Sequence, residues 1–191
     1  MSQSDDPEFQ PVEEYVPIPE CFHSFLQDGL FTHCSMCEGY LLNDGTPYLI
    51  EKAIERDEVT FEYALCFRCQ AVLAEDYSEG SLRVLSQFFA EHVKADRKKS
   101  LLDAHGLVVE PWIADCVICQ AGWNGASWKQ LIALCDGPDL LFHDAFPIML
   151  CGREVERIYH LLSKKTKDRL DDFFDEVIGR PTDTVNLPVL L

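Results

Sequence analysis

The chain has 191 residues, of which 47% are hydrophobic, and its 12 phenylalanines and 3 tryptophans are enough to build a core. Its formal net charge of −17, from 33 acidic and 16 basic residues, argues against bulk attraction to DNA, RNA or anionic lipid, because the field of the whole molecule repels phosphate. Basic or neutral partners are favoured instead.

The sequence begins Met-Ser-Gln-Ser-Asp-Asp, without a positive flank or an apolar stretch, and no run approaches the roughly 18 apolar residues of a membrane span. We therefore expect a cytosolic protein without a membrane anchor. In a reducing compartment the nine cysteines are expected to be free thiols, metal ligands or catalytic groups sooner than disulfides. Their spacing has to distinguish between these roles.

Composition divides the chain into five parts. Residues 1–20 contain six acidic residues and four prolines but no lysine or arginine, which predicts a flexible acidic arm. A first module is expected over 21–93, a basic linker over 94–106, and a second, degenerate module over 107–180. The apolar segment 181–191 is expected to be a tail that packs on the protein's own surface, with docking into a partner or a second copy as the alternative.

The first module contains signals for short strands. They lie near residues 40–42, 47–52 and 59–65, and Asn43-Asp44-Gly45 predicts a tight turn after the first of them. A helix is expected to follow the last strand.

Four cysteines in the first module have the spacing of a metal site. Cys34 and Cys37 form one Cys-x2-Cys pair, Cys66 and Cys69 form another, and the 28 residues between the pairs are enough for a hairpin that returns the chain. Two such turns can bring four thiolates to one tetrahedral zinc ion. We therefore predict one structural Zn²⁺ at these residues, with four free thiols or a redox dithiol as the alternatives.

The order of a Cys-x2-Cys knuckle, a β-hairpin and a second Cys-x2-Cys that leads into a helix resembles the treble-clef group of zinc fingers. The resemblance covers about residues 33–93. It implies a fold and a metal but no activity, because the group includes ribosomal, ubiquitin-transfer, transcriptional and nuclease members. A helix that begins at Cys69 would also place the positive end of its dipole beside the thiolate.

An internal repeat links the two modules. Residues 61–93 align without a gap onto 146–178, and nine of these 33 positions are identical. Upstream, Cys34-x2-Cys37 corresponds to Cys116-x2-Cys119. The expected fold class is therefore α+β, with two repeated zinc-finger-like modules of knuckle, hairpin and helix, the second divergent. The identical pairs are Phe61/Phe146, Leu65/Leu150, Cys66/Cys151, Arg68/Arg153, Ser78/Ser163, Leu85/Leu170, Phe88/Phe173, Phe89/Phe174 and Glu91/Glu176.

Three segments have helical patterns. Residues 124–135 predict a helix that ends at Gly137-Pro138, where the first module has strands. Two later helices have the apolar period of a packed face, which we interpret as core or as the contact between the two halves. These faces are Leu82, Leu85, Phe88, Phe89, His92 and Val93 in the first half, and Leu170, Phe173, Phe174, Val177 and Ile178 in the second.

The second module lacks one ligand. Glu154 stands where the first module has Cys69, so that only Cys116, Cys119 and Cys151 remain. We expect a metal-free copy held by apolar packing; a second zinc site with a fourth ligand, or an open catalytic site completed by water, are the alternatives. The packing residues would be Trp112, Trp123, Trp128 and Phe146. The candidate fourth ligands are Cys135, His143 and His160.

The function expected from these observations is a non-catalytic protein-interaction or regulatory module. The ligand set is closed, and the sequence has no phosphate-binding glycine loop, no His-Glu-x2-His pair and no Gly-x-Ser-x-Gly turn. One alternative is nucleic-acid binding through basic runs within 94–99 and 164–169. Another is a metal-dependent hydrolase or nuclease around His143-Asp144, for which no catalytic residues are assigned. The sequence does not predict an oligomeric state.

Overall fold

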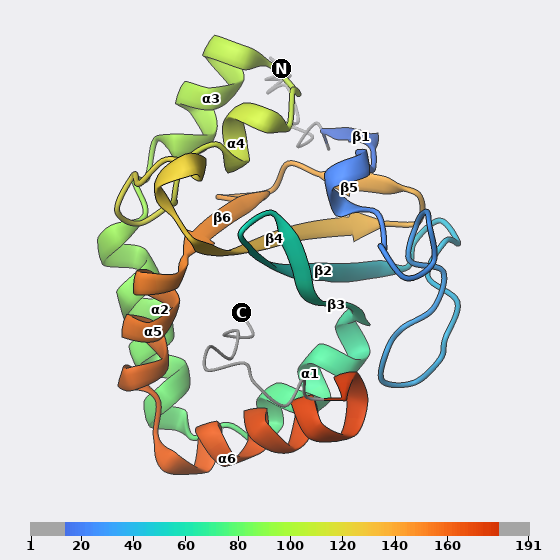
Figure 1. Ribbon diagram of the computed structural model, residues 1–191, viewed down its shortest axis with the longest axis vertical. Coiled ribbons are helices and arrows are strands. Elements are labelled where there is room, and N and C mark those ends of the chain that lie inside the picture. Colours follow the sequence, from blue (N-terminus) through green and yellow to red (C-terminus); the bar gives the residue numbers. More distant parts are fainter. Residues whose placement is uncertain (1–13, 180–191) are drawn as a thin grey trace, which may run out of the picture.

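The first half of the sheet is a long hairpin. The computed structural model describes residues 14–179, and in it β2 (Pro47–Glu55) and β3 (Glu58–Cys66) pair antiparallel (Figure 1). The chain reverses at Arg56 and Asp57, whose φ angles of 51° and 67° are those of a type I′ turn.

The expected turn at Asn43-Asp44-Gly45 precedes this hairpin, and the expected strand over 40–42 is reduced to a single bridge between His33 and Tyr40. The physical reason is that β2 is buried without a break from Tyr48 to Ile54, and the chain reverses only after this buried run ends.

The two halves of the chain meet in the middle of the sheet. β4 (Trp128–Asp136) pairs with β2 along all nine residues of each strand, from Pro47 opposite Asp136 to Glu55 opposite Trp128. The predicted helix over 124–135 is therefore wrong. A short apolar run does not distinguish a buried strand from a buried helix, and β4 is buried on nearly every residue because strands flank it on both sides.

Two short strands share the other edge of β4. β5 (Asp139–Leu141) pairs with its end and β6 (Ile148–Cys151) with its beginning. β1 (Tyr15–Pro17) then pairs with β5, so the predicted arm of residues 1–20 extends too far. Ile18 is buried just after β1, which explains why this end of the arm is ordered. Residues 1–13 and the predicted tail 181–191 lie outside the described residues.

In each half a helix begins directly after the cysteine that ends a strand, β3 in the first half and β6 in the second, as expected. α1 (Phe67–Glu75) follows Cys66, and α5 (Gly152–Leu161) follows Cys151. Each is followed by a second helix, α2 (Glu79–His92) and α6 (Lys164–Phe173) respectively, and α6 continues as a π-helical turn, η3 (Phe174–Ile178). In Figure 1, α2 and α5 lie side by side, and α6 lies at the end opposite α3.

The helix of the second half covers the strand of the first. Phe173 packs edge-to-face on Tyr63 with ring centroids 5.4 Å apart, and Phe174 on Phe61 at 5.7 Å. The paired phenylalanines of this helix are therefore a contact between the two halves, as the apolar period indicated.

The N-termini of α2 and α6 are joined by hydroxyl groups. Ser78 and Ser163 cap the two helices, and their Oγ atoms lie 2.9 Å apart. The backbone N–H of Ser78 donates to Thr166 Oγ1 at 3.1 Å, and that of Ser163 donates to Ser81 Oγ at 2.9 Å. Each cap thus binds the first turn of the other helix as well as its own.

The segment predicted as a linker, 94–106, contains α3 (Arg97–His105), which is followed by α4 (Glu110–Ile113). Trp112 is fully buried, 4.8 Å from the ring of Phe142, and the guanidinium of Arg97 lies 5.3 Å above its indole. The connecting segment is therefore anchored to the second half. Two 3-10 turns, η1 (Glu20–Phe22) and η2 (Trp123–Gly125), complete the elements within residues 14–179.

Buried apolar residues of both halves form one core cluster. Its largest fully buried side chains come from both, and include Phe22, Tyr48, Tyr63, Trp112 and Phe173. Within the described part of the chain, no helix is long and apolar enough to cross a membrane.

Candidate metal centre

The structure brings the four cysteines of the first module together. The Sγ atoms of Cys34, Cys37, Cys66 and Cys69 all lie within 4.8 Å of one another. The first pair comes from a loop beside β3, and the second from the end of β3 and the first turn of α1. This is the closed set of four sulfur donors that a tetrahedral ion requires.

The backbone of the first pair forms a tight knuckle. Cys34 N–H donates to Gly39 O at 2.8 Å and Glu38 N–H to Cys34 O at 2.9 Å, while Glu38 adopts a φ of 57°. A Cβ on Gly39 would lie 3.3 Å from Cys37 Sγ, so a larger residue would crowd the sulfur. The knuckle therefore holds both thiols toward β3, where Cys66 N–H donates to Cys34 Sγ at 3.5 Å.

Backbone amides favour the thiolate form of one ligand. Burial by itself would raise the pKa of Cys34, but N–H groups of Cys66, Cys37 and Met36 point at its sulfur and lower the pKa to about 7. Burial and the neighbouring thiols raise the pKa of Cys69 well above its usual value. A bound cation would offset that cost, because four thiolates this close repel one another.

A second cluster contains three cysteines. The Sγ atoms of Cys116, Cys119 and Cys151 lie within 4.8 Å of one another, and those of Cys119 and Cys151 are 3.5 Å apart. No fourth His, Cys, Asp or Glu ligand atom joins this group within residues 14–179. The structure therefore places together the three counterparts that the sequence indicated.

The two clusters have the same pattern of backbone hydrogen bonds. In the second, Cys116 N–H donates to Ala121 O at 2.9 Å and Gln120 N–H to Cys116 O at 2.9 Å, while Gln120 has a φ of 59°. Cys151 N–H donates to Cys116 Sγ at 3.4 Å, which matches the bond from Cys66 to Cys34. The correspondence continues where each knuckle bonds its strand: Ser35 N–H donates to Ala64 O at 2.8 Å, and Val117 N–H to Met149 O at 2.9 Å.

Glu154 does not act as the missing ligand. Its buried carboxylate accepts from Arg153 Nε at 3.2 Å and from Arg157 Nη1 at 3.3 Å. The guanidinium of Arg153 also lies close enough to Cys119 and Cys151 to act on them electrostatically. Burial would raise the pKa of Cys119, but the N–H of Ala121, the neighbouring thiols and Arg153 lower it. A positive charge on an exposed side chain therefore lies near the second cluster. The sequence showed Arg153 only as one member of a repeated pair.

The other candidate ligands lie elsewhere. Cys135 is buried in β4 opposite Tyr48 and Leu140. His143 is exposed and lies 3.3 Å from Asp144, and His160 is exposed and lies 3.7 Å from Glu156. None of the three joins either thiol cluster among the described residues.

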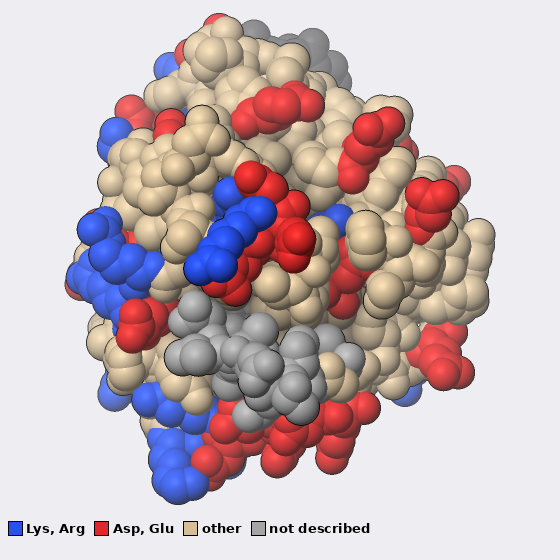
Figure 2. All heavy atoms as spheres, in the orientation of Figure 1, with Lys and Arg blue, Asp and Glu red and all other residues tan. Residues whose placement is uncertain are grey.

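The two basic runs do not converge. α3 carries the first and α6 the second, and these helices lie at opposite ends of the molecule (Figure 1). Lys164 is paired with Asp168 at 2.6 Å and Arg169 with Asp76 at 2.9 Å, which reduces the positive charge available to phosphate. In the view of Figure 2, acidic side chains lie over much of the face, and basic ones gather along one side, at the end near α6 and beside acidic ones near the middle.

The chain matches no family model, and no curated protein and no solved structure is significantly similar to it.

Proposed function

We propose that the first cluster binds one structural Zn²⁺ in a treble-clef-like module. The single observation that carries this proposal is that Cys34, Cys37, Cys66 and Cys69 supply four convergent sulfur donors, two of them at the start of a helix. Four sulfur ligands favour zinc or an iron–sulfur cluster over oxygen-seeking ions, and a closed set leaves no position for substrate. When bound, the ion would supply folding free energy and no chemistry of its own.

The second cluster is proposed to be a duplicated module that has lost its metal. Two observations support this. The two knuckles have the same pattern of backbone hydrogen bonds. The position of the fourth ligand is occupied by Glu154, whose carboxylate is paired with Arg153 and Arg157. In this proposal Arg153 provides the positive charge that the ion provides in the first cluster.

The function proposed for the whole chain is a non-catalytic protein-interaction module. Its contact point is a turn that exposes two adjacent apolar side chains, Phe25 at 74% and Leu26 at 84%. Two adjacent apolar side chains gain free energy when a partner removes them from water, which allows them to anchor an interface.

The base of this turn is held by hydrogen bonds to one carboxylate. The carboxylate of Glu62 accepts from Ser24 Oγ at 2.7 Å and from the N–H groups of Phe25 and Leu26 at 3.0 and 3.1 Å. Lys52 forms a buried ion pair with it at 3.3 Å. A turn held in this way loses little conformational entropy when a partner binds, which favours a role in recognition.

Native mass spectrometry of the full chain, purified without chelator or added metal, tests the zinc proposal. We expect one zinc per chain, retained by Cys119→Ser and Cys135→Ser and lost by Cys37→Ser. A chain without metal would overturn the structural site, and two zinc ions would overturn the metal-free second module. If Cys37→Ser does not fold, a chromogenic chelator that removes the metal from the folded wild-type chain gives the number of zinc ions per chain.

Affinity enrichment with metal-loaded chain tests the interaction surface. We expect a specific protein to be enriched by the wild type and by Val108→Ser, which changes an apolar side chain that is 52% exposed elsewhere. The double variant Phe25→Ser/Leu26→Ser should lose that protein while it keeps its zinc. Enrichment that is equal for both variants would refute the assignment of this turn.

A further inference from the structure

The second thiol cluster contains two sulfur atoms that are close enough to form a disulfide. Cys119 Sγ and Cys151 Sγ lie 3.5 Å apart, and both cysteines are free thiols. A disulfide requires an S–S distance of about 2 Å, so the two atoms have to approach by about 1.5 Å, which rotation of the side chains can supply. The two cysteines are 32 positions apart in the chain, so the fold and not the local sequence brings them together.

Cys119 has the surroundings of a thiol that an oxidant can reach. It is half-buried, whereas Cys116 and Cys151 are buried. The exposed guanidinium of Arg153 acts electrostatically on both Cys119 and Cys151. A solvent-accessible thiol with a cation and a second thiol beside it is typical of cysteines that peroxides oxidise reversibly.

Backbone contacts hold the turn that carries Cys119 against β6. Val117 N–H donates to Met149 O at 2.9 Å, and Cys151 N–H donates to Cys116 Sγ at 3.4 Å. Both bonds join the Cys-x2-Cys turn to the strand that ends in Cys151. The closeness of the two sulfurs therefore follows from the path of the backbone, and not only from the orientation of two side chains.

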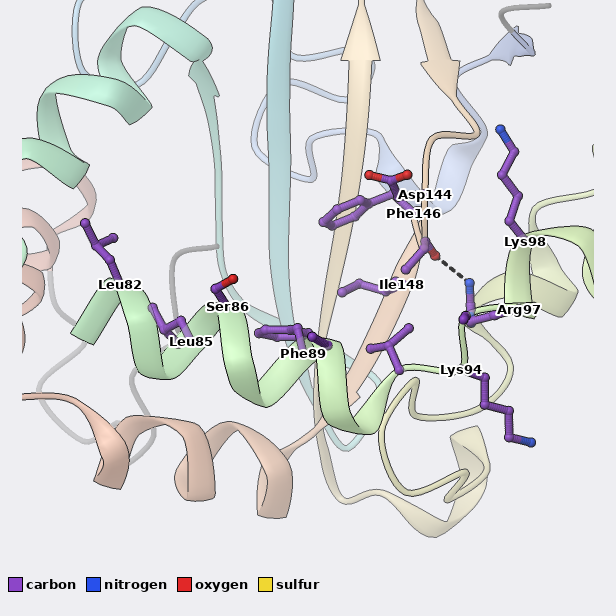
Figure 3. Close-up of a pocket in the computed structure, with 14 residues that line it drawn as sticks. Leu82, Leu85, Ser86, Phe89, Lys94, Arg97, Lys98, Asp144, Phe146 and Ile148 are labelled. Atoms are coloured by element: carbon purple, nitrogen blue, oxygen red, sulfur yellow. Dashed lines mark hydrogen bonds between the residues drawn. The ribbon is translucent and has the colours of Figure 1, made fainter. Parts of the chain in front are cut away.

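Arg97 ties together the two segments that lead to these cysteines. Its guanidinium donates to the carbonyl oxygen of Trp112, in the helix before the turn, and to that of Ala145, in the loop before β6 (Figure 3). Figure 3 also shows Ile148, the first residue of β6, pointing toward Phe89 of α2. The fold therefore fixes both segments without a covalent link between them.

The corresponding pair of the first cluster differs in its number of donors. Cys37 and Cys66 are the counterparts of this pair in the repeat, and their sulfurs lie 3.9 Å apart. Cys34 and Cys69 complete that cluster, and the Zn²⁺ proposed above would hold all four thiolates as ligands. The second cluster has no fourth ligand within residues 14–179, which leaves its thiols available for oxidation. This step rests on the proposed absence of metal from the second cluster.

We propose that Cys119 and Cys151 form a reversible dithiol–disulfide site that is oxidised by hydroperoxides. The sulfur of Cys119 attacks one peroxide oxygen, the O–O bond breaks, and a sulfenic acid forms while the departing oxygen takes the proton of the thiol. The sulfur of Cys151 then attacks the sulfenic sulfur, the S–O bond breaks, and water leaves with the proton of Cys151. The two thiols lose two electrons and two protons in all, and the hydroperoxide is reduced to an alcohol, or to water if it is hydrogen peroxide, plus one further water.

Peptide mapping of the metal-loaded full chain tests the proposal. The chain is treated with a small excess of hydrogen peroxide, alkylated at its remaining thiols and digested with trypsin without reduction. We expect peptides 100–129 and 130–153 to be joined, with a mass about 2 Da below their sum, and dithiothreitol to separate them. Each peptide contains a second cysteine, so variants identify the pair. Cys116→Ser and Cys135→Ser should keep the link, and Cys119→Ser should lose it. If Cys116→Ser does not fold, fragmentation of the joined wild-type peptides locates the same bond.

Zinc content, measured on the same samples, keeps this proposal separate from the zinc proposal. Joined peptides in a chain without zinc would support the disulfide site and refute the structural zinc. One zinc per chain without joined peptides, or an equal yield of joined peptides from Cys119→Ser, would overturn the disulfide site alone. Two zinc ions per chain would overturn both this site and the metal-free second module, because Cys119 and Cys151 would then be ligands. Oxygen on Cys119 that dithiothreitol does not remove would also overturn the site, since Cys151 would have failed to form the disulfide.

Discussion

At the scale of single residues, the buried ion pair of Lys52 and Glu62 should make a large contribution to stability. Both side chains are at most 6% exposed. Replacing Glu62 by Gln leaves the ammonium of Lys52 buried without its anion, and we expect the free energy of unfolding to fall by about 3 kcal/mol. Urea denaturation measures this, with Glu58→Gln, an exposed acid on the same strand, as the control. A loss no larger than that of the control would contradict the prediction.

The same residue should impose a pH dependence. Burial would raise the pKa of Glu62, but the N–H of Phe25, the hydroxyl of Ser24, the N–H of Leu26 and the charge of Lys52 together lower it below the usual 4.5. The carboxylate therefore stabilises the fold above about pH 4.5, and this contribution is lost as the pH falls through the lowered pKa of the folded state. The stability difference between wild type and Glu62→Gln should shrink on acidification; a constant difference would refute the linkage.

At the scale of elements, the joined N-caps of α2 and α6 should be energetically coupled. Ser78→Ala and Ser163→Ala each remove a cap, at a cost of about 1 kcal/mol. Because the two hydroxyls also bond each other, the double variant should deviate from additivity by about 0.5–1 kcal/mol. A double-mutant cycle in urea measures the coupling. Ser163→Ala combined with Ser100→Ala, an exposed serine of α3, should be additive.

At the scale of the whole molecule, the two halves should unfold as one unit. β2 and β4 pair over nine residues each, and the core cluster includes side chains of both halves. All three tryptophans lie in the second half, whereas the four-thiol cluster lies in the first. Tryptophan emission and release of the proposed zinc ion would therefore report on different halves of one structure.

Removal of the proposed zinc ion should accordingly change the second half. We expect a chelator to shift tryptophan emission and lower Tm, and zinc release and tryptophan exposure to follow the same urea curve. A tryptophan transition that is unaffected by chelation would mean that the halves are independent. The variant Cys119→Ser, which leaves the four-thiol cluster intact, should respond to chelator as the wild type does.

The thiol clusters could be predicted from the sequence because their signals are local. A Cys-x2-Cys pair places two sulfur atoms on one turn. Cys66 and Cys151 each stand directly before a helix, so the two halves place these cysteines in the same way. The helix faces that end in paired phenylalanines followed from the apolar period in the same way. Local chemistry therefore predicted the cysteine groups, although the bound ion remains a proposal.

Tertiary structure decided what depends on distant partners. Residues 128–136 form a strand because β2 satisfies their backbone along its length, and Tyr15–Pro17 is ordered because β5 offers an edge. The carboxylate of Glu154 is bound by Arg153 and Arg157, which its position in the repeat does not reveal. The sequence by itself thus determined which residues are chemically equipped to act together, whereas pairing and burial, which join segments far apart in the chain, determined which of them meet.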